Sequence, residues 1–135
     1  MARCALLLLA LAAPLAAGCG TSDDRDEARA AVERFYAAVR DDDAEAACEQ
    51  LGDPTLAQLE SQSGRPCESV ITRLEYDGGA VARTQVFITN AKVDLRSGES
   101  AFLSREDDGW KLSAIGCRAE KGKPADRPFE CEVES

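Results

Sequence analysis

Hydrophobic and polar residues follow two different periods along this chain. In the first half, apolar residues recur at spacings of three and four, which predicts an amphipathic helix over about residues 24–40. Acidic residues gather just before and within its first turn, where they favour the positive end of the helix dipole. The apolar face of this helix consists of Ala28, Ala31, Val32, Phe35 and Val39.

Shorter helical segments are expected at about residues 44–51, 53–62 and 66–74. A run of aspartates before the first segment supplies an N-cap, and Gly52 ends that helix. Pro54 suits the first turn of the second segment, because its missing N–H has no partner there in any helix.

From Val81 onward the period changes to two, which predicts β-strands. They are expected at about residues 84–89, 91–96, 101–104 and 110–115, with a short edge strand near 129–133 and a loop over 116–128. Because the turns are short, neighbouring strands must be antiparallel. Helices followed by a meandering sheet of four or five strands indicate an α+β fold.

An apolar run at residues 5–17, preceded by Arg3, comes before the first helix. It is shorter than the roughly 20 residues that a membrane span needs, so residues 1–18 are interpreted as a signal peptide. The run ends in Ala16-Ala17-Gly18-Cys19, which resembles a bacterial lipobox. The resemblance implies that the Cys19 thiol takes a diacylglycerol, and that a further acyl chain such as palmitate can be added to its new amino group.

The same small residues also suit an ordinary cleavage site, which would release a free secreted protein beginning at Cys19. Cysteine parity favours the lipid interpretation. Five of the six cysteines remain once the leader, with Cys4, is removed, and five thiols in an oxidising compartment leave one unpaired. Acylation of Cys19 leaves an even number.

The four remaining cysteines allow three pairings. Cys48–Cys67 and Cys117–Cys131 are preferred, because each pair is close in sequence and flanks one local unit. The disulfide of the second pair is expected to stabilise the fold by about 3 kcal/mol, because the closed loop lowers the entropy of the unfolded chain. A zinc site is disfavoured because the chain has no histidine and no Cys-x-x-Cys, and no metal or cofactor is expected.

Residues 19–26 are expected to form a flexible tether, and residues 27–135 a single domain. The formal net charge is −9, and it becomes −10 after loss of Arg3, with 15 basic against 25 acidic residues. Such a chain repels nucleic acid and anionic lipid headgroups. The lipid bilayer is therefore expected to hold it through the covalent anchor on Cys19.

Two stretches resemble proteins similar to nuclear transport factor 2: Val32-Glu33-Arg34-Phe35-Tyr36-Ala37-Ala38-Val39 and Asp107-Asp108-Gly109-Trp110-Lys111-Leu112. More narrowly, residues spread over the chain resemble small secreted lipoproteins of that superfamily (Phe35, Tyr36, Cys48, Cys67, Trp110, Cys117). The similarity covers about residues 27–117. It implies a cystatin-like cone, in which helices close over a curved antiparallel sheet. Sheet faces in this superfamily often pair into homodimers, but the alternation along these strands does not define an exposed apolar face for a second copy.

Isomerases with this cone use a tyrosine as oxyanion donor and a carboxylate as base. Tyr36, Tyr76, Asp94 and Glu99 are the candidates here. Because there is no histidine, such an enzyme would need a carboxylate with a raised pKa. The alternative interpretation is that Tyr36 packs in the core with its hydroxyl at the rim, and that Asp94 is solvated.

We therefore expect a non-catalytic lipoprotein, anchored on the extracytoplasmic face of the bacterial cell membrane, that binds a small ligand or an envelope protein. The pocket of the cone is expected to involve Tyr36, Phe87, Asp94 and Trp110. Two alternatives stay open, which are an enzyme of the isomerase or cyclase type and a free secreted protein.

Overall fold

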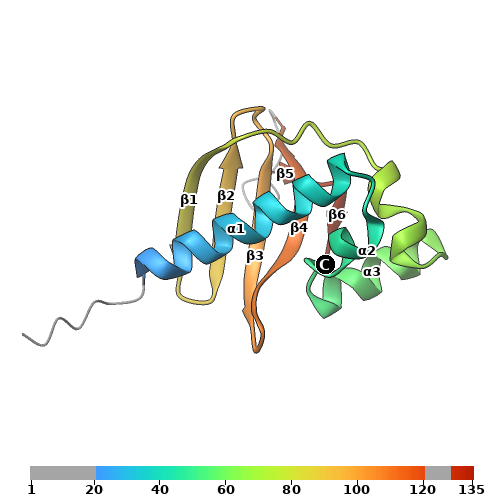
Figure 1. Ribbon diagram of the computed structural model, residues 1–135, viewed down its shortest axis with the longest axis horizontal. Coiled ribbons are helices and arrows are strands. Elements are labelled where there is room, and N and C mark those ends of the chain that lie inside the picture. The colour runs from blue at the N-terminus through green and yellow to red at the C-terminus, as the bar shows by residue number, and fades with distance from the viewer. Residues whose placement is uncertain (1–20, 121–128) are drawn as a thin grey trace, which may run out of the picture.

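The computed structural model describes residues 21–120 and 129–135, and in it helices precede an antiparallel sheet (Figure 1). The α+β order expected from the two hydrophobic periods is confirmed. The expected signal peptide and the lipidation residue Cys19 lie outside the described residues.

Helix α1 (Thr21–Arg40) crosses one face of the sheet (Figure 1). It includes residues 21–26, which we expected in a flexible tether. Asp23 and Asp24 stabilise its first turn, and an ion pair from Asp24 to Arg105 ties that turn to the sheet. No helix in the described ranges is long and apolar enough to cross a membrane.

Helix α2 (Ala44–Cys48) is capped by the Asp43 carboxylate, which accepts a hydrogen bond from the Ala46 N–H at 3.1 Å. It ends earlier than expected because the next residues pair with the sheet. Leu51 forms a parallel bridge with Leu112, whose carbonyl accepts a hydrogen bond from the Gly52 N–H at 3.0 Å. Pairing with a distant strand thus replaces the last helical turn.

Helix α3 (Asp53–Ser63) has a proline in its first turn and ends at Gly64, whose φ of 66° lies in the left-handed region that glycine tolerates. The helical segment expected after Pro66 consists of two 3₁₀ turns, η1 (Cys67–Ser69) and η2 (Ile71–Arg73). The disulfide Cys48–Cys67 joins α2 to η1, which is the expected pairing.

The sheet contains β1 (Val81–Phe87), β2 (Asn90–Leu95), β3 (Ser100–Glu106) and β4 (Gly109–Ala119) in sequence order, with β5 (Phe129–Glu130) and β6 (Val133–Glu134) both paired to β4. β4 continues into the segment that we expected to be a loop. A left-handed Gly116 (φ 65°) and two register shifts against β3 keep the long strand paired. The second expected disulfide, Cys117–Cys131, is also formed.

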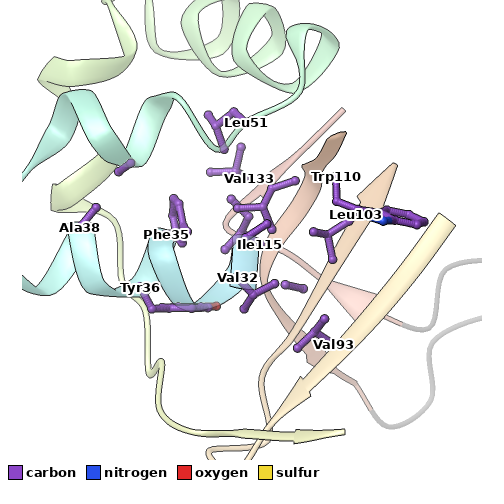
Figure 2. Close-up of a cluster of buried hydrophobic side chains, with 14 of the residues drawn as sticks. Val32, Phe35, Tyr36, Ala38, Leu51, Val93, Leu103, Trp110, Ile115 and Val133 are labelled. Atoms are coloured by element: carbon purple, nitrogen blue, oxygen red, sulfur yellow. The ribbon is translucent and has the colours of Figure 1, made fainter. Parts of the chain in front are cut away.

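The core lies between α1 and the inner face of the sheet (Figure 2). Val32 and Phe35 of α1 are fully buried there, and Val93, Leu103 and Ile115 meet them from three strands. This packing places Tyr36 and the first residue of β3, Ser100, inside the molecule, where the polar groups discussed below gather.

Candidate functional site

A buried carboxylate stands at the centre of the polar interior. Glu99, at the end of the β2–β3 turn, is 1% exposed, and its carboxylate accepts four hydrogen bonds. Oε1 accepts from the Asp77 N–H at 2.8 Å and from Arg118 Nη2 at 2.9 Å. Oε2 accepts from the Gly78 N–H at 2.8 Å and from the Tyr36 hydroxyl at 3.2 Å. The cluster thus joins α1, the connection before β1, the β2–β3 turn and strand β4.

Close packing holds the tyrosines of this cluster in place. Gly78 has a left-handed φ of 59°, and a Cβ on it would meet the Tyr36 ring at 3.2 Å. The Tyr76 ring stands edge-on to Phe35 and to Tyr36, with centroids 5.4 and 6.1 Å apart. The Tyr76 hydroxyl is buried and has no hydrogen-bond partner among the described residues. The structure therefore brings together three of the four candidates for catalysis: Tyr36, Tyr76 and Glu99.

The surroundings keep both phenols neutral. Burial raises the pKa of Tyr36, and the negative charge of Glu99 beside it raises that pKa further. Burial also raises the pKa of Tyr76, with smaller contributions from Glu132 and Glu99. The interpretation of Tyr36 as a residue with its hydroxyl at the rim is wrong, because the hydroxyl points inward and donates a hydrogen bond to the buried Glu99 carboxylate.

The hydrogen bonds of Glu99 limit its chemistry. A carboxylate has about four lone-pair sites, and four donors from the protein occupy them here. A general base must accept a proton from its substrate, so Glu99 would have to release a contact that holds the fold. The arrangement is that of a structural anchor between helix and sheet.

Asp94 lies apart from this cluster. It alternates along β2 with the buried Val93 and Leu95, so it belongs to the outer face of the sheet. Lys92 Nζ lies 2.8 Å from its carboxylate, and the Ser100 hydroxyl donates to it at 2.7 Å. Partial burial works against the charge, but these two hydrogen bonds hold the pKa of Asp94 below its usual range. A base with a raised pKa is therefore not found here.

The four residues expected to share a pocket lie in different surroundings. Tyr36 is bonded to Glu99 in the interior, and Asp94 is paired on the outer face. Phe87 is 56% exposed at the end of β1, whereas Trp110 is 4% exposed at the start of β4. The expected pocket is not formed by these side chains, because Tyr36 belongs to α1 and the other three lie on three different strands, with different exposure to solvent.

A groove of about 1420 Å³ lies on another side of the molecule, between α1, the α2–α3 connection and the β3–β4 hairpin. In Figure 1 this hairpin extends well past α1. Trp110 forms part of the wall, and the Arg105 guanidinium lies 5.5 Å from the centre of its ring. Because Arg105 is also ion-paired to Asp24, the wall is tied to the first turn of α1.

The groove is negatively charged. Its basic side chains are engaged, since Arg105 pairs with Asp24, Lys111 pairs with Asp108 at 2.9 Å, and Arg34 donates to Gln50 at 3.0 Å. Six other lining carboxylates form no ion pair within the described part of the chain: Asp26, Glu27, Glu49, Asp53, Glu106 and Asp107. Within the described ranges, no cluster of three or more His, Cys, Asp or Glu side chains is arranged so that it could hold a metal ion.

Sequence reasoning missed both the groove and the partner of Glu99. Asp107 belongs to a stretch that carries the family resemblance, and Asp26 to the expected tether and helix start. Arg118 falls in the segment 116–128 that we expected to be a loop, whereas it reaches Glu99 from the extended β4. The sequence signal that points toward the groove is the recurrence of adjacent acidic residues. No local pattern, however, shows that these residues line one surface.

The chain matches no protein-family profile, no curated protein and no solved structure. A functional proposal therefore rests on the residues and on the geometry described above.

Proposed function

We propose that this protein is a non-catalytic lipoprotein, anchored on the extracytoplasmic face of the bacterial membrane, whose domain binds a positively charged ligand or partner segment in its acidic groove. The observation that carries the proposal is the groove itself, where six carboxylates without an ion pair in the described part of the chain lie around a wall that includes Trp110. Charged clefts raise the local concentration of counter-ions and ligands, so this surface attracts cations.

Cysteine pairing supports the anchor. The two disulfides use all four cysteines of the domain, so Cys19 has no remaining thiol partner in the mature chain. A diacyl anchor would remove that odd thiol and would hold an acidic protein on a membrane that its charge does not favour. The order of helices and antiparallel strands also supports our proposal that the domain is a cone similar to nuclear transport factor 2.

The alternative of an isomerase-type enzyme has one observation in its favour, which is the meeting of Tyr36 and Glu99. The saturation of Glu99 by four protein donors weighs against it, because a substrate would find no free lone pair. We therefore favour binding over catalysis. The alternative of a free secreted protein is tested by the mass of the mature N-terminal peptide, since absence of an acyl group on Cys19 would contradict the anchor.

Trp110 provides a probe for the groove because it is the only tryptophan of the chain. We expect spermine and trilysine to change its fluorescence in a saturable manner, with an affinity that falls as salt is added. The double substitution Glu106→Gln and Asp107→Asn should lower this affinity by about threefold for each charge removed.

The matched control is the double substitution Glu68→Gln and Asp41→Asn. It removes the same charge from exposed positions that do not line the groove. Its affinity for spermine should stay close to that of the parent protein. An equal loss in both variants would mean that only the net charge matters, and it would contradict a binding site in the groove.

A further inference from the structure

The turn between β1 and β2 exposes two large apolar side chains. Ile88 is 92% exposed and Phe87 is 56% exposed, and they are the large hydrophobic residues that the described part of the chain leaves open to solvent. Monomeric proteins tolerate single exposed apolar residues, but an adjacent pair at the tip of a hairpin is a typical contact surface.

The backbone of Ile88 is strained. Its φ of 53° lies in the left-handed region, where a β-branched side chain is an outlier with a steric cost. Glycine or asparagine would form the same turn without that cost. The position therefore holds a side chain that helps neither the turn nor the core, which points to a contact outside the folded domain.

This turn lies beside the start of α1. The Thr89 carbonyl accepts a hydrogen bond from the Arg105 N–H at 2.8 Å, and the Arg105 side chain pairs with Asp24 in the first turn of that helix. Figure 1 shows the β1–β2 turn and the first turn of α1 at the same corner of the molecule. Because α1 begins at Thr21, only Gly20 separates it from Cys19 in the sequence.

We propose that Phe87 and Ile88 insert into the lipid bilayer next to the acylated Cys19, and so fix how the domain stands on the membrane. The inference rests on the proposed lipid anchor. An anchor two residues from α1 holds the turn at a high effective concentration near the interface, where a phenyl ring and a branched aliphatic chain are both favourable. The position of the turn therefore favours a lipid surface as the partner that Phe87 and Ile88 contact.

The charges nearby decide what kind of bilayer is expected. Asp24 is paired with Arg105, but Asp23, Asp26 and Glu27 outnumber Arg25 in the first turns of α1, so anionic headgroups would be repelled. The contact should therefore be apolar and should occur on zwitterionic phosphatidylcholine without added anionic lipid.

The test uses the mature acylated protein in phosphatidylcholine vesicles that carry bromine on their acyl chains. Ile88→Trp places a fluorophore at the turn, and the parent protein supplies the background of Trp110. Arg96→Trp is the matched control, because it lies at the opposite end of β2 in the sequence and is also exposed. We expect the bromolipids to quench the fluorescence of Trp at position 88 and to leave that at position 96 unchanged.

The mass of the N-terminal peptide from the same sample separates the two proposals. Acylated protein without quenching at position 88 overturns this inference and leaves the anchor standing, whereas protein without an acyl group overturns both. Ile88→Asn gives a second test, because asparagine tolerates a positive φ. Its urea midpoint in solution should equal or exceed that of the parent, and a lower midpoint would show that Ile88 serves the fold instead.

Discussion

At the scale of single residues, Glu99 shows how a buried charge is held. Its carboxylate accepts hydrogen bonds from two backbone N–H groups, one hydroxyl and one guanidinium. A buried charge without such partners would be costly, and with them it fixes one arrangement of the groups around it. The cluster thus defines how the connection before β1 sits against α1 and β4.

Glu99→Ala should reduce the free energy of unfolding by about 3 kcal/mol, because it leaves buried donors without an acceptor. Glu132→Ala is the control, since Glu132 meets the same Arg118 at 3.4 Å but its side chain is 30% exposed. The control should lose less than about 1 kcal/mol. Urea denaturation measures both values, and similar losses would contradict the central role of Glu99.

The raised pKa of Tyr36 makes alkaline stability a second test. Below pH 10 the phenol is protonated in the folded and unfolded chain alike, whereas above pH 10 only the unfolded chain releases its proton. Stability should therefore fall as pH rises above about 10, and Tyr36→Phe should reduce that slope by about 1.4 kcal/mol per pH unit. Urea midpoints between pH 8 and 11 measure it, and an unchanged slope would show that the hydroxyl is not buried in solution.

At the scale of elements, the boundaries of α2 and β4 follow pairing and not propensity. α2 stops at Cys48 because residues 50–52 hydrogen-bond to Leu112, and β4 continues to Ala119 because the C-terminal strands pair with it. The first adjustment joins the helical half to the sheet, and the second extends the sheet itself. The Cys48–Cys67 disulfide then holds α2 against η1, which has little regular helix of its own.

Replacing Cys48 and Cys67 together by serine should cost about 3 kcal/mol, because the unfolded chain regains the entropy of an open loop. The matched variant replaces Cys117 and Cys131, which close a loop of similar length, with a sequence separation of 14 against 19. Loss of η1 and η2 should appear as faster amide exchange at residues 67–73 in the first variant alone. Exchange that increases equally in both variants would contradict a local role for Cys48–Cys67.

At the scale of the whole molecule, negative charge is the dominant feature. The chain carries 25 acidic and 16 basic residues, and six of the carboxylates that line the groove form no ion pair with any residue that the structure describes. Self-repulsion of this kind destabilises a compact state, and salt reduces it. In our proposal the same charge collects cationic ligands in the groove, while the anchor and the Phe87–Ile88 turn hold the domain on the bilayer.

Raising sodium chloride from about 0.01 to 0.15 M shortens the screening length from about 30 to 8 Å, and should therefore raise the thermal midpoint. Potassium and tetramethylammonium chloride should have the same effect, because screening does not depend on the cation. A midpoint that stays flat or falls would mean that ion pairs such as Asp24–Arg105 outweigh the repulsion.

The sequence by itself determined the local features of this protein. Hydrophobic periods located α1 and the strands, an aspartate capped α2, and cysteine spacing predicted both disulfides, because each of these depends on residues that are near in sequence. Only the tertiary structure decided the features that join distant residues. Tyr36 and Glu99 are 63 positions apart, and the groove combines residues from α1, the α2–α3 connection and the β3–β4 hairpin. Such contacts depend on how helix and sheet pack in space, which no single stretch of the chain encodes.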